Sequence, residues 1–146
     1  MAELPNADVL ERFVRQEFPQ APAARILEAG PDRVRVERPT DEADLRPGGT
    51  VSGPVMMALA DHVAYLAVLA AVGLEALAVT THLSIDFLRK PPAGTALVAE
   101  AEIVKLGKSL VVVQVQLQAG PFRVAVASVT YSRPPGRPAG SSGSTL

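Results

Sequence analysis

The chain has 146 residues, a length typical of a single domain. Hydrophobic residues make up 48% of it and charged residues 20%, which is enough apolar material to fill a core and excludes a disordered chain. The net charge of −1 provides no overall basic surface for nucleic acid or for an anionic membrane. With no cysteine and only two histidines, the sequence predicts no disulfide and no metal site.

The start of the sequence does not have the pattern of a targeting signal. The first 18 residues are charged throughout and lack the apolar stretch of a signal peptide. The longest apolar run, Val63–Leu74, is shorter than the roughly 20 residues that cross a bilayer. We therefore expect a cytoplasmic protein without a membrane span. Because the apolar content is high for a soluble monomer, we also expect an oligomer.

Short elements are expected before residue 50. Apolar residues recur at helical spacing within Ala7–Phe18, and two prolines follow, which predicts a short amphipathic helix. The stretches Ala24–Ala29 and Arg33–Arg38 lie on either side of a Gly-Pro-Asp turn signal, and the second alternates apolar and charged residues like a half-exposed strand. Residues 39–49 are rich in acids, Pro and Gly, which indicates a loop.

The segment Pro54–Val72 is predicted to be a long helix inside the protein. It is rich in Ala, Leu and Met, and its proline suits the first helical turn. Ser52 or Gly53 would be the N-cap, and Gly73 suits the C-cap. Only two adjacent polar residues interrupt its apolar surface. A helix that is apolar all round and does not span a membrane must be enclosed by protein.

Four strands are predicted after the helix. They are Ala78–Lys90, Thr95–Leu106, Ser109–Gln118 and Phe122–Tyr131, separated by turn signals. In the first strand, alternation places Thr80 and His82 on the polar face, opposite Leu83. Consecutive antiparallel strands with short turns form a meander. The sequence therefore predicts an α+β fold in which a long central helix is wrapped by a curved antiparallel sheet.

We expect one domain over residues 1–133, with residues 1–22 as an N-terminal helical extension. Residues 134–146 are rich in Pro, Gly and Ser, which is typical of a flexible tail.

Three sequence motifs occur in a characteristic order between Gly48 and Pro134. They are GGTVSGPVMMALAD at the start of the long helix, VTTHLSIDFLRKPP in the next strand and LGKSL in a hairpin. With them the chain resembles the hotdog-fold thioesterases of the phenylacetic-acid-degradation (PaaI-like) type. In that family a His-Gly-Gly loop leads into the central helix, and an acidic residue follows eight positions after the first Gly. Gly53 and Asp61 have this spacing.

The resemblance implies an acyl-CoA thioesterase without a metal or redox cofactor, coenzyme A being part of the substrate. It implies that the backbone N–H of Gly53 polarises the thioester carbonyl at the helix N-terminus. Asp61 would be the general base or the nucleophile, and Thr80 would orient water. The central helices of the family lie side by side across a homodimer, so Gly53 of one chain would meet Asp61 of the other. Two dimers would then pair.

Departures from the family pattern leave other functions open. Ser52 stands where the family has His, Pro54 replaces the second Gly, and no Asn or Gln lies around residues 46–48. The Ser52 hydroxyl could still bond substrate or cap the helix. The alternative is a hotdog protein that binds an acyl-CoA or another acyl ligand without hydrolysing it. A hotdog dehydratase or hydratase fits less well, because His62 points about 100° away from Asp61 on the helix.

Asp61 is also a candidate without the family resemblance. It is a carboxylate in an apolar helix, about 12 Å along the axis from Gly53. A buried carboxylate is costly unless it is paired or functional, so Asp61 either acts in chemistry or accepts bonds from a neighbouring loop. Tyr65, one turn further on the same face, either packs or lines an acyl pocket.

The lysines are confined to one stretch of the sequence. The three of them, Lys90, Lys105 and Lys108, follow Arg89 within 20 residues. A local basic patch could bind the phosphates of coenzyme A, although a charged edge that discourages strand pairing is an equal alternative. The candidate CoA-binding residues are Arg89, Lys90, Gly107, Lys108 and Ser109. Tyr65 is the further candidate for contact with the substrate.

Overall fold

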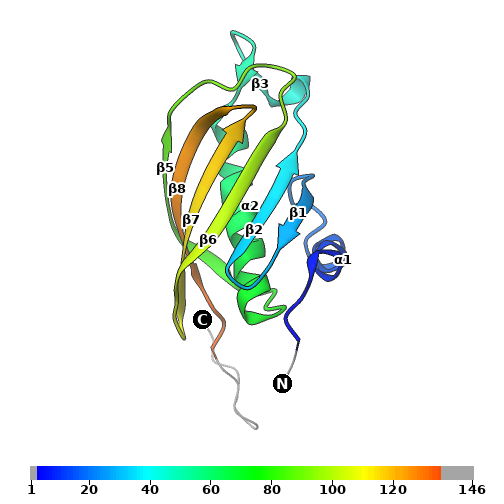
Figure 1. Cartoon of the computed structure of the whole chain (residues 1–146), viewed down its shortest axis with the longest axis vertical. Coiled ribbons are helices and arrows are strands. Elements are labelled where there is room, and N and C mark those ends of the chain that lie inside the picture. The colour runs from blue at the N-terminus through cyan, green and yellow to red at the C-terminus, as the bar shows by residue number, and fades with distance from the viewer. Residues whose placement is uncertain (1–2, 136–146) are drawn as a thin grey trace.

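The computed structural model describes residues 3–135 as one long helix against the concave face of a curved antiparallel sheet (Figure 1). The helices are α1 (Ala7–Glu17) and α2 (Gly53–Val72), with a short 3₁₀ turn, η1 (Glu42–Asp44). The six strands of the main sheet are β1 (Arg25–Ala29), β2 (Arg33–Arg38), β5 (Val79–Phe87), β6 (Leu97–Leu106), β7 (Leu110–Ala119) and β8 (Phe122–Ser132). The α+β architecture predicted from the sequence is confirmed. Residues 136–146 of the predicted tail lie outside the described residues.

Helix α2 forms the centre of the core. Twelve of its 20 residues are buried, and they pack against β2, β6, β7 and β8. Its ends follow the sequence signals, since Ser52 is the N-cap and Pro54 lies in the first turn. Gly73 ends the helix with a φ of 107°, which favours glycine, and its N–H donates to the carbonyl of Leu69 at 2.9 Å.

By length and composition alone, α2 would also suit a membrane span. However, 67% of its most apolar 18-residue window is buried inside the fold, as expected for the core helix of a globular domain.

The order of the strands differs from the predicted meander. The sheet runs β1-β2-β6-β7-β8-β5, so of the four strands after the long helix only β6, β7 and β8 follow one another, while β5 pairs with β8 at the edge. The segment after β5 contains two adjacent prolines and crosses the end of the sheet in Figure 1 before β6 begins. A connection of this length does not form a tight hairpin, so it lets β5 and β6 lie apart.

The hairpin between β6 and β7 is confirmed at Gly107. The N–H of Gly107 donates to the carbonyl of Leu110 at 2.9 Å. A Cβ at this position would lie 2.6 Å from the same oxygen, so the turn requires glycine.

A β-bulge changes the faces of β5. Thr80 pairs with Tyr131 and His82 pairs with Thr130, so one extra residue lies between them. Thr80 consequently faces α2, on the same side as Leu83, which packs against the core. The prediction that Thr80 shares the polar face with His82 is wrong, because simple alternation cannot account for a bulge.

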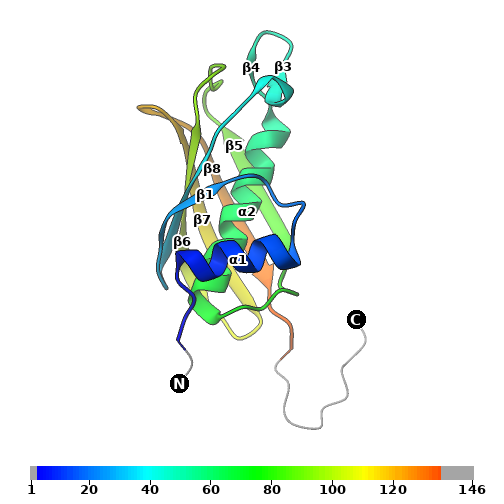
Figure 2. The ribbon, with the colours of Figure 1, turned by 90° about the vertical axis from the view of Figure 1, so that its right-hand side faces the viewer.

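The N-terminal elements extend this unit at the other edge of the sheet. Helix α1 is capped by the side chain of Asn6 and buries Leu10, and Figure 2 shows it crossing α2. The hairpin of β1 and β2 joins the sheet through β6. All three elements lie where the sequence predicts them.

The predicted loop over residues 39–49 is held by one ion pair. Arg38 donates two hydrogen bonds, of 2.9 and 3.0 Å, to the Asp44 carboxylate, and this guanidinium lowers the pKa of Asp44. The carbonyl of Asp44 in turn accepts the N–H of Ser52 at 2.9 Å. A two-stranded ribbon, β3 (Leu45–Arg46) and β4 (Thr50–Val51), completes the loop. The N-terminus of α2 is thereby fixed against the end of β2.

Candidate active site along the central helix

Two hydroxyl groups hold one oxygen of the Asp61 carboxylate. The Thr80 hydroxyl donates to Oδ1 of Asp61 at 2.5 Å, and the Tyr131 hydroxyl donates to the same atom at 2.9 Å. The Tyr131 hydroxyl also lies 3.1 Å from the main-chain oxygen of Asp61. Within residues 3–135 no hydrogen bond to Oδ2 is found. The carboxylate is therefore oriented through Oδ1, and its second oxygen is available.

Tyr131 is a site residue that the sequence analysis missed. Its side chain is only 4% exposed. Burial raises the pKa of Tyr131, and the negative charge of Asp61 raises it further, so the phenol keeps its proton at neutral pH and can donate. A signal was present in the sequence, since Tyr131 lies two positions after Val129 and four after Ala127 and therefore shares their buried face of β8.

Tyr65 packs behind this pair. Its ring lies 5.9 Å from the ring of Tyr131 and 6.1 Å, edge to face, from that of Phe18. Its hydroxyl donates to the carbonyl of Ala76 at 3.2 Å. Tyr65 lines neither of the two cavities described below. Its contact with an acyl group stays a prediction.

A cavity of about 410 Å³ lies at the N-terminus of α2. It is lined by Gly53 together with Arg46, Arg89 and Lys90 and with apolar residues that include Phe87. The N–H of Gly53, in the first helical turn, has no intrahelical acceptor. The structure thus places two of the predicted cations beside Gly53 and adds Arg46, which the sequence analysis did not single out.

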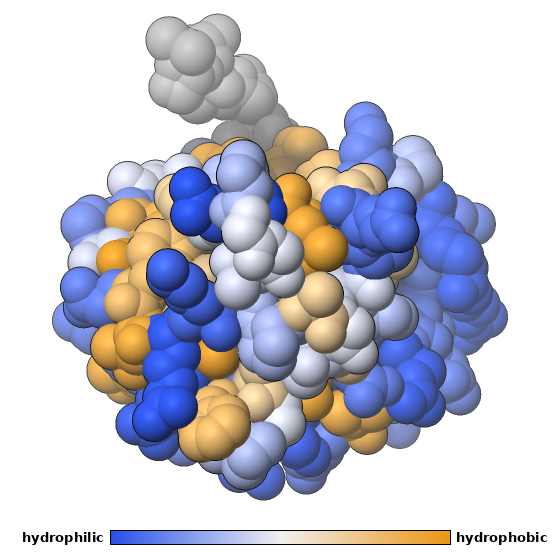
Figure 3. All heavy atoms as spheres, turned by 90° about the horizontal axis from the view of Figure 1, so that it is seen from above, coloured by the Kyte–Doolittle hydropathy of each residue, from blue (hydrophilic) through white to orange (hydrophobic). Residues whose placement is uncertain are grey.

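Polar groups at this end of α2 are available to a ligand. The Ser52 hydroxyl makes no capping bond, although Ser52 is the N-cap. The guanidinium of Arg89, a residue that lines the cavity, lies 4.3 Å from the centre of the Phe122 ring, a cation–π contact. Seen from this end of the molecule, strongly polar and apolar surface alternate (Figure 3).

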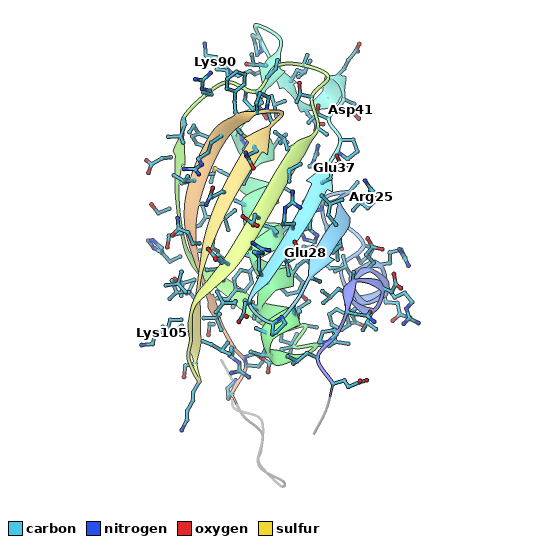
Figure 4. The ribbon with its side chains drawn as sticks, in the orientation of Figure 1. Arg25, Glu28, Glu37, Asp41, Lys90 and Lys105 are labelled. Atoms are coloured by element: carbon cyan, nitrogen blue, oxygen red, sulfur yellow. The ribbon has the colours of Figure 1, made fainter. Side chains whose placement is uncertain are left out.

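The remaining predicted CoA-binding residues lie elsewhere. Gly107, Lys108 and Ser109 form the turn after β6, whereas Lys90 precedes that strand. Figure 4 shows Lys90 and Lys105 at opposite ends of the molecule. A strand of this length spans about 33 Å. The prediction of one basic patch is therefore wrong for the single chain.

His62 is buried on another face of α2. It is 5% exposed, and its Nδ1 has no hydrogen-bond partner among the described residues. Burial lowers the pKa of His62 to about 4, against the opposing effect of the Asp61 charge. His62 therefore lies in the core, whereas His82 is exposed on β5. Among residues 3–135 no group of three His, Asp or Glu side chains could hold a metal ion.

Comparison with known proteins identifies the family of the chain. The family model described as "Thioesterase superfamily" matches residues 48–126, more than half of the sequence. The chain belongs to the thioesterase superfamily. The family resemblance in the sequence is thus confirmed.

One relative is similar to the chain in sequence, and one solved structure is similar to it in both sequence and fold. A protein of Deinococcus radiodurans named as an esterase is 35% identical over 95 residues, which are 65% of this chain and 62% of that protein, less than two thirds of its length. The structure of a protein described as a thioesterase from a Silicibacter species is 41% identical, with a TM-score of 0.83 over 92% of this chain and 96% of that one.

More distant thioesterase-fold structures confirm the hotdog fold. The PaaI protein of Escherichia coli has a TM-score of 0.71 at 22% identity, covering 85% of this chain and 89% of its own. A thioesterase-named protein of Streptococcus pneumoniae, described with coenzyme A, has a TM-score of 0.76 at 22% identity, covering 88% and 99%.

The burial of His62 makes the stability of this thioesterase-superfamily protein depend on pH. The pKa of His62 is about 4 in the folded protein, against 6.5 in an unfolded chain. Below pH 6.5 the unfolded chain binds a proton that the folded protein does not, so the free energy of unfolding decreases as the pH falls toward 4. From pH 7 to pH 4.5 we expect His62 to account for a loss of about 2 kcal/mol, measured by urea unfolding.

Two substitutions check this effect. His62→Gln should remove this part of the pH dependence, whereas His82→Gln, at an exposed position, should retain it. Equal pH dependence in the wild type and in His62→Gln would contradict the prediction.

Proposed function

We propose that the protein is an acyl-CoA thioesterase in which Asp61 acts on the thioester. The observation that carries the proposal is the orientation of Asp61: two hydroxyls bond Oδ1, whereas Oδ2 has no hydrogen-bond partner among residues 3–135 and the residue is only partly buried. A carboxylate that is fixed in this way can take a proton from water or attack a carbonyl directly. Membership of the thioesterase superfamily supports hydrolysis of a thioester.

The reaction has the same balance by either route. As general base, Asp61 takes a proton from water while the water oxygen bonds to the thioester carbon; the C–S bond then breaks, and the thiolate of coenzyme A takes up the proton. As nucleophile, Asp61 forms a mixed anhydride and releases the thiolate; water then cleaves the anhydride, its OH going to the acyl group and its other proton through Asp61 to the thiolate. In both routes negative charge develops on the carbonyl oxygen, where the N–H of Gly53 would stabilise it.

A second copy of the chain would complete the site. Gly53 and Asp61 of one helix are about 12 Å apart along its axis, too far to act on the same carbonyl. Pro54, Met57, Ala58 and Asp61 recur at helical spacing and form a stripe that the sheet leaves uncovered. This stripe is next to β5, whose outer edge has no strand partner within the described residues.

Pairing of two β5 edges about a two-fold axis would bring the two helices together in opposite directions. The Gly53 cavity of one chain would then approach Asp61 of the other, as the family resemblance implies. In the same dimer, the β6–β7 hairpin of one chain, which contains Lys108, would lie toward the end of the other chain that contains Lys90. We propose this homodimer as the active form, and the pairing of two dimers stays a prediction.

The cations at the Gly53 cavity would hold coenzyme A. Arg46, Arg89 and Lys90 provide positive charge beside the helix N-terminus, a suitable place for phosphate groups. The Streptococcus pneumoniae relative described with coenzyme A supports this ligand for the shared fold.

A second candidate function is acyl-CoA binding without hydrolysis. It is favoured by Ser52 at the family His position and by the lack of an Asn or Gln upstream. Calorimetry that shows acyl-CoA binding without release of free thiol for any member of an acyl-CoA panel would support this function and rule out the enzyme.

Replacement of Asp61 tests the proposed function directly. Asp61→Asn keeps the shape of the side chain but removes its basicity, so kcat should fall by at least about 100-fold on the best acyl-CoA substrate of a panel. The release of free thiol measures the rate. Asp32→Asn, at an exposed turn, is the matched control and should keep full activity. Equal rates for Asp61→Asn and the wild type would disprove the role of Asp61.

Removal of the Tyr131 hydroxyl tests the orientation of Asp61. Tyr131→Phe loses a hydrogen bond to a charged group, so kcat should fall by roughly 10-fold to 100-fold while KM stays unchanged. Thr80→Val should act in the same way, and Thr80→Ser should restore the rate. Thr40→Val, which loses only a bond to the carbonyl of Thr95, is the control. A parallel change in KM, or no rescue by Ser, would indicate packing alone.

The homodimer is tested by a charge on the uncovered stripe. Met57→Glu should give monomers in light scattering and lose activity, because a carboxylate would be buried between the two helices. Leu27→Glu is the control, since Leu27 is 39% exposed, close to the 40% of Met57, but lies in β1 at the far edge of the sheet. A dimeric Met57→Glu variant would contradict the proposed interface.

A further inference from the structure

The cavity at Gly53 has cations in its walls without a lining acid. They are Arg46, Arg89 and Lys90. A larger cavity of about 640 Å³ between α1 and α2 shares no lining residue with it and has Glu11 beside its arginines. Among the described residues, neither Arg89 nor Lys90 forms an ion pair. The cavity at Gly53 is therefore the better suited of the two to an anionic ligand.

An exposed aromatic ring lies on the same side of the sheet as this cavity. Phe122 is 47% exposed and begins β8, directly after the turn from β7. It pairs with Ala119, which is only 2% exposed. Directly paired residues point to the same side of a sheet, so Phe122 points to the concave side, where α2 lies. Phe87, which lines the cavity, points to this side as well, because it pairs with the buried Ala125.

Arg89 connects the ring of Phe122 with the cavity. After β5, the N–H groups of Leu88 and Arg89 donate to the carbonyl of Val124, at 2.8 and 3.3 Å, so this segment follows the start of β8. The guanidinium of Arg89 lies 4.3 Å from the centre of the Phe122 ring and also lines the cavity. Aromatic rings and guanidinium groups are the flat side chains on which nucleic-acid bases stack. The two residues thus provide a stacking surface beside a cationic cavity.

We propose that Phe122 and Arg89 bind the adenine ring of coenzyme A by stacking, while Arg46 and Lys90 bind its phosphate groups. Adenine is the only aromatic part of coenzyme A, and Phe122 is the exposed aromatic residue next to the cations. Phe122 does not line the cavity at Gly53, so its ring would contact a part of the ligand remote from the thioester. The inference rests on the proposed coenzyme A ligand, but it holds whether or not the bound thioester is hydrolysed.

The acidic residues at this end of the molecule do not oppose the phosphate groups. Asp86, the residue before Phe87, pairs with Val126 and points to the convex side of the sheet. Figure 4 shows Asp41 on the other side of this end from Lys90. In the proposed homodimer the β5 edges meet, whereas Phe122 belongs to β8, one strand further in.

Calorimetry on the full chain tests the stacking surface without any turnover. Phe122→Leu keeps an apolar side chain but removes the ring, so the Kd of coenzyme A should rise about tenfold, within the range for loss of one stacked base. Pantetheine, which lacks the nucleotide, should bind the wild type and Phe122→Leu equally. Adenosine 3′,5′-bisphosphate, the nucleotide part of coenzyme A, should bind by itself and lose affinity by the same factor.

Two further variants separate stacking from apolar packing. Phe122→Trp should keep the Kd of the wild type, because an indole also stacks on a base. Phe18→Leu is the matched control, since Phe18 is 41% exposed but lies at the end of α1, and it should not change the Kd. If Phe122→Leu does not fold, nuclear Overhauser effects between the adenine protons and the Phe122 ring of the wild type decide; the chain has only four Phe.

Three results would overturn the proposal. They are an equal Kd of coenzyme A for the wild type and Phe122→Leu, an equal loss of affinity for pantetheine, and a loss of binding that light scattering traces to monomers, which would make Phe122 an interface residue. A wild type that binds no coenzyme A would refute the proposed ligand as a whole, whereas coenzyme A binding that ignores Phe122 refutes the stacking surface alone.

Discussion

The burial of α2 against a single curved sheet is the constraint on which the rest of the molecule depends. Twelve residues of the helix are in the core, so its axis, its rotation and its ends are fixed by packing. The sheet covers only part of the helix, however, and Asp61 lies at the boundary between the covered and uncovered faces. There, strands can supply hydroxyls to Oδ1 while Oδ2 stays open. One packing arrangement thus accounts for both stability and the candidate chemistry.

The same constraint divides the candidate site between two places. Because a helix rises about 1.5 Å per residue, Gly53 and Asp61 cannot approach each other within one chain. The uncovered stripe of α2 lies beside the edge of β5 that has no strand partner in the described part of the chain, so one contact between two copies would cover both. It would also bring the two halves of the site together. The fold of the single chain therefore supplies the parts of the proposed thioesterase site, and association would assemble them.

Local sequence signals predicted most of the elements correctly. The proline and glycine at the ends of α2, the alternation in β7 and the glycine of the β6–β7 turn each act within a few residues, so they can be recognised without tertiary information. The failures have a different origin. The position of β5 beside β8 depends on which strands pair, and the direction of Thr80 depends on a bulge in that pairing. Tyr131 was missed because it reaches Asp61 across 70 positions of the sequence.

The sequence by itself determined the long apolar helix, the strands around it, the family and the position of Asp61 within its motif, because these follow from composition, periodicity and short-range spacing. Only the tertiary structure decided that Thr80 and Tyr131 hold Asp61, that Arg46 joins Gly53, and that Nδ1 of the buried His62 has no hydrogen-bond partner among residues 3–135. These facts depend on strand order, register and helix rotation. Such features are set by the packing of the whole core, which no local pattern of residues specifies.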